Sequence, residues 1–420
     1  MQSRSRSMLC CLCFAAVCDS PLVAQTFTFT QPKTVLTFSQ NQFYRTQTLD
    51  LNGDGKTDLA LHLYAGELNV YLGDGAGGFS ITPIVANTWE VGANAPAPMF
   101  VDVNGDGFAD QVFGVSSYND PYGKLSWAGE FAVALGDGKG HFTMTFNQLA
   151  LDGDASSLVQ GDFNGDGKPD FALLTSGGLD TNGEQVGAAI TLFLNQGNGA
   201  FAAQNPIWLQ AKSGTWMVAG DFNGDGKQDL AWTSLNTPAQ TTKGAYPIYY
   251  MYGNGNGSFG AVQSYWVDTP PRGLAAGDLN HDGKTDLVVS LSPLVNQYGQ
   301  TATGSNYRIA TLLAKQTGGF YWASSETSAT PTTGLELMDL NADGQPDAIY
   351  DWDYLRAGLA GGAFGPHQIV PYSTPYTFPY QDDMLFAPLI KNGLPAVFSW
   401  ALGTTSGSYN LRVQLNTSQK

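Results

Sequence analysis

Acidic side chains recur along this chain in a nine-residue pattern whose residue types could bind a metal ion. The pattern D-x-N-x-D-G-x-x-D begins at Asp50, Asp102, Asp162, Asp221, Asp278 and Asp339. It places oxygen-bearing side chains at loop positions 1, 3, 5 and 9, and a glycine at position 6, where the chain must turn. Because Ca²⁺ takes six to eight oxygen ligands and tolerates irregular geometry, each copy is predicted to be a calcium loop.

The repetition of the pattern favours calcium loops over ordinary polar turns. Asp, Asn and Gly dominate turns in general, so one copy could be a turn and nothing more. A turn does not require a fixed Asp at position 9, however, and the six copies begin 52 to 61 residues apart. Position 7 varies, as expected if that residue contributes only its main-chain carbonyl.

The net charge has its main source in these loops. The chain has a formal charge of −17, and positions 1, 5 and 9 of the six loops supply 18 of its 36 acidic residues. Bound calcium would offset much of that charge. We therefore expect no nucleic-acid partner, because such partners require a basic surface.

The first 24 residues are predicted to be a signal peptide, cleaved after Ala24. Arg4 and Arg6 precede a short apolar run, Met8–Val17, which is too short to span a membrane. All four cysteines lie in this segment, so the mature chain would have neither disulfides nor thiol chemistry. Lipid attachment at Cys18 is a weaker alternative. We expect a secreted protein, or a periplasmic or cell-surface one, without a transmembrane segment in the mature chain.

The segments on either side of each loop are predicted to be short β-strands. Apolar β-prone runs precede and follow the loops, such as Trp216–Ala219 and Leu230–Trp232. A third run, a Gly-rich turn and a Phe follow in each unit, and a fourth strand is predicted to begin near that Phe (Phe79, Phe142, Phe201, Phe259, Phe320 and Phe364). Four antiparallel strands in about 50–60 residues form one propeller blade.

A seventh repeat is predicted after the sixth loop. Gly393–Phe398 aligns with Gly167–Ala172, and this alignment puts Pro388, Ile390, Asn392 and Ala396 at the ligand positions, so no calcium is expected there. An unrelated terminal cap is the alternative. Thr34–Phe38 is predicted to be the missing fourth strand of this blade and to close the ring. Residues 25–420 would then form a single all-β domain, a seven-bladed β-propeller with four-stranded antiparallel blades.

The loops and the Gly-x-Phe turns together resemble the FG-GAP/VCBS repeat family, whose fold is similar to the integrin α-chain propeller. The resemblance covers nearly all of the mature chain and implies about six Ca²⁺, each bound between the first two strands of a blade. His281 and Ala342 depart from the pattern at position 4, which is not a ligand position. The implied ligands, with the position 7 residue contributing its carbonyl, are Asp50, Asn52, Asp54, Lys56, Asp58; Asp102, Asn104, Asp106, Phe108, Asp110; Asp162, Asn164, Asp166, Lys168, Asp170; Asp221, Asn223, Asp225, Lys227, Asp229; Asp278, Asn280, Asp282, Lys284, Asp286; and Asp339, Asn341, Asp343, Gln345, Asp347.

A ligand-binding face is predicted opposite the calcium loops. Long connectors between the second and third strands of units two to five carry Tyr118, Tyr122, Trp127, Tyr298 and Tyr307, aromatic residues of the kind that bind sugars or proteins. Insertions without a ligand are the alternative. The expected partner is an extracellular glycan or protein, and the expected state is a monomer.

No catalytic or organic-cofactor site is predicted. The four histidines of the mature chain show neither metal-type nor triad-type spacing, and the sequence contains no G-x-S-x-G, H-E-x-x-H or phosphate-binding loop. The sequence thus predicts a calcium-binding recognition or adhesion module. A polysaccharide lyase, for which Tyr122 and Lys124 are the only suggestive pair, and a purely structural module are the alternatives.

Overall fold

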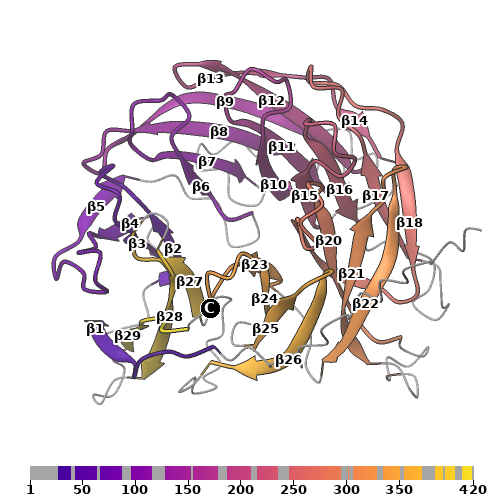
Figure 1. The fold of residues 1–420 in the computed structure, drawn as a ribbon. Helices are drawn as coiled ribbons and strands as arrows, with labels where there is room; N and C mark the ends of the chain where they lie inside the picture. Colours follow the sequence, from indigo (N-terminus) through magenta and orange to yellow (C-terminus); the bar gives the residue numbers. More distant parts are fainter. Residues whose placement is uncertain are drawn as a thin grey trace, which may run out of the picture.

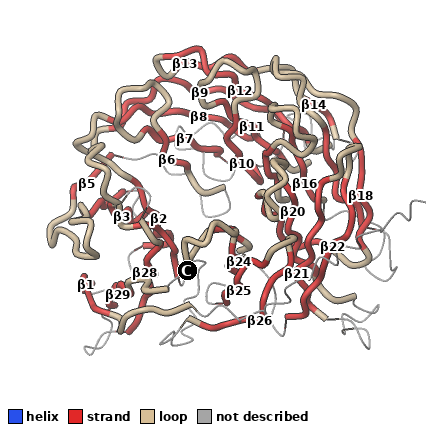
Figure 2. Tube along the Cα trace, in the orientation of Figure 1, coloured by secondary structure: helices blue, strands red, loops and turns tan. Residues whose placement is uncertain are grey.

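The structure is a computed structural model of the 420-residue chain. It describes residues 27–38, 43–63, 67–87, 96–115, 128–152, 155–177, 187–209, 215–234, 246–294, 301, 306–328, 334–350, 354–370, 384–390, 393–402 and 409–418. The regular structure of these segments is entirely β-strand, with no helix (Figure 2). The predicted signal peptide and its four cysteines lie outside them.

The strands form seven antiparallel sheets arranged in a ring, as Figure 1 shows. Blade one contains β2 (Phe43–Leu49), β3 (Asp58–Leu63), β4 (Glu67–Tyr71) and β5 (Ile84–Asn87). Blade two contains β6 (Met99–Val101), β7 (Asp110–Val115), β8 (Ala128–Gly136) and β9 (Phe142–Asp152). Blade three contains β10 (Ala155–Gly161), β11 (Asp170–Thr175), β12 (Ala189–Gly197) and β13 (Ala200–Ala203), and the short β14 (Ile207–Trp208) also pairs with β12.

The remaining blades follow the same order along the chain. Blade four contains β15 (Met217–Gly220), β16 (Asp229–Thr233), β17 (Tyr246–Met251) and β18 (Gln263–Val267). Blade five contains β19 (Pro271–Gly277), β20 (Asp286–Leu291), β21 (Tyr307–Ala314) and β22 (Phe320–Ser328). Blade six contains β23 (Glu336–Met338), β24 (Asp347–Tyr350), β25 (Tyr354–Leu359) and β26 (Ala363–Ile369). Blade seven contains β27 (Met384–Pro388), β28 (Pro395–Leu402), β29 (Tyr409–Gln414) and β1 (Lys33–Phe38). The predicted all-β seven-bladed propeller is thereby confirmed.

The second strand of a blade is buried on both of its faces. In β11 every residue of Asp170–Thr175 is buried, and the same is true of β20. Each such strand is covered by the neighbouring blade on either side, so its sequence is an almost continuous apolar run and not an alternating one. Outer strands such as β18 are mostly exposed. This burial explains why the runs after the acidic loops were recognisable as strands.

Among the described residues, the buried hydrophobic side chains form seven clusters, each between two adjacent blades. The cluster between blades four and five contains Phe222, Ile248, Leu287, Leu312 and Phe320. The cluster between blades seven and one contains Leu36, Leu59, Leu61, Phe398 and Leu411. Because every blade buries both faces against its neighbours, the stability of each blade depends on the two beside it.

Blade seven has the strand register of the other blades although its loop lacks aspartate. In the first six blades, the residue before loop position 1 pairs with the Asp at position 9, as Gly161 pairs with Asp170. In blade seven, Ala387 pairs with Ala396 in the same way. Ala396 is buried, so an apolar side chain occupies the place of a buried carboxylate. The structure therefore supports a seventh repeat at the predicted alignment.

The N-terminal strand β1 lies beside the last strand of the chain. It pairs antiparallel with β29, and the preceding Phe29 forms an isolated bridge with Asn416. Two further main-chain hydrogen bonds join the termini, from Thr30 N to the Leu415 carbonyl (2.9 Å) and from Thr417 N to the Thr28 carbonyl (2.8 Å). The first and last described segments, residues 27–38 and 409–418, are thus joined along one antiparallel ladder.

The fourth strand of two blades begins later than the sequence suggested. In blades one and four, the Phe of the turn makes only an isolated bridge, Gly73 with Phe79 and Gly253 with Phe259. The strands themselves begin at Ile84 and Gln263. The Phe closes a tight turn in these blades, and several residues pass before the ladder resumes.

His62 in β3 is a buried core residue and not a ligand. Its side chain is 2% exposed, and its Nε2 lies 2.8 Å from Gln47 Oε1. Burial, aided by the charge of Arg45, lowers the pKa of His62 to about 3. In the unfolded chain this pKa is about 6.5. Acidification therefore favours the unfolded chain, in which His62 takes up a proton more readily. The contribution of neutral His62 to stability is fully present above pH 6.5 and is lost as the pH falls towards 3.

We expect the His62→Gln variant to lose less stability than the wild type between pH 7 and pH 5. The difference should reach about 2 kcal/mol at pH 5, because each pH unit below 6.5 costs about 1.4 kcal/mol. Urea unfolding at both pH values measures it. His367, which is exposed on β26, provides the matched control, and His367→Gln should follow the wild type. Parallel pH profiles for His62→Gln and the wild type would contradict the prediction.

Candidate metal centres

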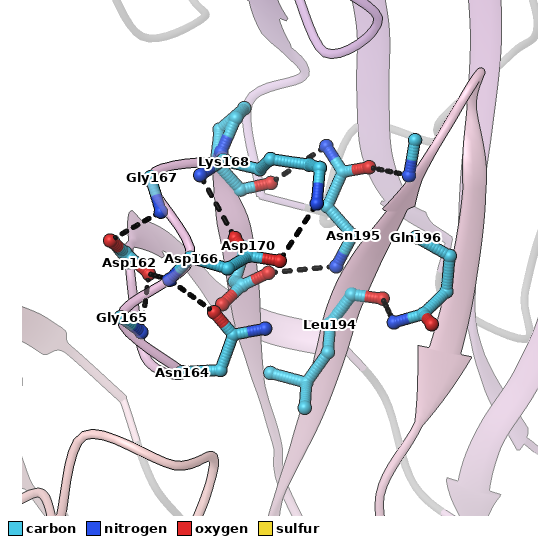
Figure 3. A network of polar contacts seen from close by, with 12 residues as sticks. Asp162, Asn164, Gly165, Asp166, Gly167, Lys168, Asp170, Leu194, Asn195 and Gln196 are labelled. Carbon is cyan, nitrogen blue, oxygen red and sulfur yellow. Dashed lines mark hydrogen bonds and ion pairs between the residues drawn. The ribbon is translucent and has the colours of Figure 1, made fainter.

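Each acidic loop joins the first and second strands of its blade and is folded around its own side chains. In the loop of blade three, Asp162 Oδ1 accepts hydrogen bonds from Gly165 N (2.7 Å) and Asp166 N (3.1 Å), and its Oδ2 accepts one from Gly167 N (2.9 Å) (Figure 3). Asn164 Oδ1 accepts a second bond from Asp166 N (2.9 Å). The side-chain oxygens of positions 1 and 3 thus accept hydrogen bonds from the same main-chain N–H, that of Asp166.

The carboxylate at position 5 is shared with the residue at position 7. Asp166 Oδ1 accepts a bond from Lys168 N (3.0 Å), and its Oδ2 forms an ion pair with Lys168 Nζ (2.9 Å). The hydrogen bonds from Lys168 lower the pKa of Asp166. Three other loops contain the same ion pair, with Lys56, Lys227 and Lys284. Lysine at position 7 therefore supplies a counter-charge to the position 5 carboxylate, a role separate from that of the predicted carbonyl ligand.

The Asp at position 9 is buried and links two parts of its blade. In blade four, Asp229 Oδ2 accepts a bond from Phe222 N at position 2 (2.8 Å), and Oδ1 accepts one from Gly253 N, just after the third strand (2.7 Å). All six position 9 aspartates make this pair of bonds. Their partners after or at the end of the third strand are Gly73, Gly136, Asn195, Gly253, Ala314 and Gly358.

Burial makes these position 9 carboxylates costly to ionise. It raises the pKa of Asp58, Asp110, Asp229 and Asp286 to about 6 and that of Asp347 to about 7, and it also raises the pKa of Asp170. The two main-chain N–H donors oppose this effect without cancelling it. A nearby cation would favour the ionised form further.

Glycine after the third strand allows the close approach that the position 9 bonds need. A Cβ atom at Gly136 would lie 2.2 Å from the Ala109 carbonyl oxygen, and one at Gly253 would lie 2.1 Å from that of Gln228. Both carbonyls belong to position 8 of the acidic loop. The Gly-rich turn and the acidic loop are therefore packed backbone to backbone on the same face of the propeller.

The chain turns left-handed at loop position 4 as well as at position 6. The φ angles at position 4 are 71° to 81° in the four loops with glycine, 57° at His281 and 56° at Ala342. An L-residue is strained in this region, and Gly is not. The prediction for position 4 concerned only the absence of a ligand, and the left-handed backbone at this position is a finding of the structure.

The donor types of the loops fit a hard cation. Each loop offers three carboxylates, one side-chain amide oxygen and the carbonyl at position 7, all of them oxygen ligands of the kind that Ca²⁺ prefers. In the described part of the chain, no three Asp, Glu, His or Cys side chains are gathered closely enough to hold a metal ion. The position 9 oxygens are bonded to the main chain, and the oxygens at positions 1, 3 and 5 accept bonds within the loop. The calcium assignment stays a prediction.

Family comparison agrees with the repeats that the loops define. The chain matches the FG-GAP-like repeat family over residues 50–113, 175–232 and 239–289, and the FG-GAP repeat family over residues 213–263. The chain carries FG-GAP repeats. With seven four-stranded blades, it is consistent with an integrin α-like propeller. No curated protein matches the sequence as a relative.

The solved structures similar to this FG-GAP protein share its fold at low identity. An Agrocybe aegerita lectin, described for its specific recognition of non-reducing terminal N-acetylglucosamine, is 18% identical with a TM-score of 0.52, covering 79% of this chain and 80% of the lectin. BBS1N, solved in complex with ARL6DN, is 10% identical with TM-scores of 0.53 and 0.54 in two structures, covering 94% of this chain and 99% of BBS1N. At these identities the likeness concerns the fold alone.

The strain at position 4 of the sixth acidic loop can be relieved by glycine. We expect Ala342→Gly to stabilise the protein by about 1 kcal/mol, because a left-handed non-Gly residue costs about 1–2 kcal/mol in the folded state. Part of this gain is offset because glycine also increases the conformational entropy of the unfolded chain. Urea unfolding measures the change. The same substitution at buried Ala348, six residues later in β24, should destabilise the protein instead. A destabilised Ala342→Gly variant would contradict the strain argument.

Most of the predicted ligand face lies outside the described residues. Tyr118, Tyr122, Lys124, Trp127 and Tyr298 are all in this category. Tyr307 is described and begins β21, where it pairs with Ser328 of β22 and is partly buried. The structure therefore shows one of the predicted aromatic residues, and as part of a strand ladder.

Proposed function

We propose that this protein is an exported, monomeric, calcium-binding propeller that recognises a glycan or a protein. The observation that carries the proposal is the recurrence of one acidic loop, with the same main-chain bonds, at the same place in six blades. Loops generally vary more than the elements that they connect, so six copies of one loop with the same bonds indicate a shared role. FG-GAP propellers are typical of extracellular domains, and no helix in the described residues is long and apolar enough to cross a membrane.

Calcium would act in these loops as a structural ion. Positions 1, 3, 5 and 9 and the carbonyl of position 7 would hold it, and the ion would offset the repulsion among three carboxylates. A site filled at 100 times its Kd would stabilise the fold by about 2.7 kcal/mol. The loops themselves would orient these oxygens through their Asx-type hydrogen bonds, as seen at Asp162 and Asn164.

The proposed recognition role is supported by what the fold neighbours do. The lectin is described as recognising a terminal sugar, and BBS1N was solved with a protein bound. Propellers of this shape present many loops on two faces, and these loops can vary without disturbing the blades. A purely structural module remains the alternative, and it would bind neither class of ligand.

Two measurements test the proposal. Equilibrium dialysis of the processed protein followed by metal analysis should find about six Ca²⁺ per chain, in line with one ion per acidic loop. A glycan array and a pull-down against extracellular proteins, each with and without chelator, should then identify the ligand. Absence of bound divalent ions would exclude the calcium role. Ions without any glycan or protein partner would favour the structural module.

We propose binding without catalysis. Half of the 36 acidic residues belong to the loops, and the sequence contains none of the catalytic motifs named above. Incubation with acidic polysaccharides, followed by the absorbance of unsaturated products, tests this proposal against the lyase alternative. Steady product formation that depends on Tyr122 and Lys124 would establish the enzyme instead.

A further inference from the structure

The acidic loops of blades four and five are joined at the first residue of the blade-four loop. Thr285, at position 8 of the blade-five loop, donates from its N–H to the Asp221 carbonyl (2.7 Å), and its Oγ1 accepts a bond from the Asp221 N–H (3.1 Å). Asp221 occupies position 1 of the blade-four loop and is one of its proposed calcium ligands. Both main-chain groups of a proposed ligand are thus bonded to the neighbouring blade.

Two close packing contacts accompany these hydrogen bonds. A Cβ atom at Gly220, the residue before position 1, would lie 2.5 Å from Thr285 Cγ2, so a glycine is needed for the two blades to meet here. A Cβ atom at Gly224, position 4 of the blade-four loop, would lie 3.2 Å from Lys284 Cγ. The Lys284 side chain is 5% exposed, whereas the other three lysines at position 7 are 42% to 45% exposed. Loop five therefore lies directly against loop four.

The carboxylate of Asp221 is held by its own loop. Its Oδ1 accepts bonds from Gly224 N (2.7 Å) and Asp225 N (3.1 Å), and its Oδ2 accepts one from Gly226 N (2.7 Å). Blade four therefore orients the carboxylate, while blade five holds the backbone that carries it. In the loops of blades two, three and six, a bond from the next blade reaches the carbonyl at position 2, which is not a proposed ligand.

We propose that Thr285 is a positioning residue for the calcium site of blade four, and that through it the sites of blades four and five bind calcium cooperatively. Thr285 lies between positions 7 and 9 of its own loop, which both supply proposed ligands. Calcium held by those ligands would restrain Thr285 from both sides, and with it the backbone of Asp221. A ligand that is already ordered loses less conformational freedom on binding, so its site gains affinity. The inference rests on the proposed calcium role and adds a coupling between two of its sites.

Thr57 provides an internal comparison because it occupies position 8 in blade one. Its N–H donates to the Leu389 carbonyl (2.9 Å), and its hydroxyl donates to the Pro388 carbonyl, both in the blade-seven loop that lacks aspartate. The same contact between blades is therefore present where no calcium site is proposed in the preceding blade. Position 8 of blade six is Pro346, which has no N–H group to donate, so the site of blade five lacks this link to blade six.

Equilibrium dialysis of the processed protein over a range of free Ca²⁺ concentrations tests the positioning role. Thr285→Val removes the acceptor for the Asp221 N–H at nearly constant volume, so one ion should bind about fivefold to tenfold more weakly than in the wild type. Thr285→Ser keeps the acceptor and should retain the wild-type isotherm. Thr57→Val, the matched control, should leave every calcium affinity within about twofold of the wild type. In an Asp225→Ala background, which lacks the blade-four site, Thr285→Val should not weaken any remaining ion.

Removal of one site at a time tests the cooperativity. Asp282→Ala in blade five should eliminate one ion and weaken a second about fivefold, because the loop that carries Thr285 is no longer restrained by calcium. Asp343→Ala in blade six should eliminate one ion and leave the other five at wild-type affinity. Asp282→Ala does not remove the Thr285 hydrogen bonds, so this comparison holds even if Thr285→Val fails to fold. An Asp282→Ala isotherm that differs from the wild type by one ion alone would overturn the cooperativity.

Failure of the inference and failure of the calcium role give different results. About six bound ions with the same affinities in Thr285→Val and the wild type would overturn the positioning role and leave the calcium role intact. Equal weakening of one ion by Thr57→Val and by Thr285→Val would show that each threonine acts on its own loop, which would also overturn it. Absence of bound ions from the wild-type protein would remove the calcium role and the coupling together.

Discussion

Asp229→Ala should destabilise the protein by about 3–5 kcal/mol, the largest effect expected from a single loop residue. Asp229 is fully buried, and its two oxygens accept the main-chain N–H groups of Phe222 (2.8 Å) and Gly253 (2.7 Å). Alanine leaves both donors buried without partners, and each such group costs about 1–3 kcal/mol. The cavity left by the carboxylate adds to this cost.

The free-energy cost of Asp229→Ala should exceed the stability that is regained by removing a buried carboxylate. Burial raises the pKa of Asp229 to about 6, so at pH 7 its ionised form is already less favourable in the folded state than in water. Alanine relieves that penalty. It also removes the two carboxylate oxygens that accept from Phe222 N in the loop and from Gly253 N after the third strand, whereas a protonated aspartate would still accept from at least one of these donors. For this reason Asp229→Asn, which keeps one acceptor, should fall between the wild type and alanine.

Urea unfolding with calcium and with chelator measures both variants. Asp225, at position 5 of the same loop, is the matched control because it is an exposed aspartate whose ion pair with Lys227 (3.2 Å) lies at the surface. Surface pairs contribute about 0–1 kcal/mol, so Asp225→Ala should cost little in chelator. If the loop binds calcium, Asp225→Ala should cost more when calcium is present. Equal losses for Asp225→Ala and Asp229→Ala in chelator would contradict the buried-link role.

The repeats were predictable because their signals are local. Position 9 follows position 1 at a fixed distance, and the strand after it is an apolar run because both of its faces are buried, as at Phe171–Leu174. The seventh blade could be aligned for the same reason. Ala396 occupies the register of Asp170 although the metal-binding chemistry is absent.

The hydrogen bonds that join each acidic loop to the third strand of its blade could not be predicted from the spacing of residues in the sequence. The bond from the position 9 Asp reaches a residue 11 positions away in blade six and 28 positions away in blade five. This separation varies because the connector between the second and third strands varies in length. Glycine donates to the position 9 Asp in four of the six blades, and this glycine is the one sequence feature that indicates a close approach. In the other two blades the donors are Asn195 and Ala314, so the feature is absent there.

Removal of residues 25–39 should destabilise the propeller by about 5 kcal/mol or more. The deletion takes away β1, which pairs with β29, and with it Leu36, which is 7% exposed between blades seven and one. It also removes Phe27, which is 5% exposed against Leu340 and Phe386. Loss of one buried large side chain alone costs about 2–5 kcal/mol, and the deletion removes two together with a strand of main-chain bonds.

A circular rearrangement distinguishes loss of the strand from a general effect of truncation. The ladder continues beyond β29, where Thr30 N bonds to the Leu415 carbonyl and Thr417 N bonds to the Thr28 carbonyl. Residues 25–39 attached behind Lys420 through a short flexible linker can therefore return along β29 as a hairpin. This variant should recover most of the stability, as measured by thermal and urea unfolding, because the same strand reaches the same edge from the other terminus. Unchanged melting after the deletion would show that β1 contributes nothing to holding blade seven against blade one.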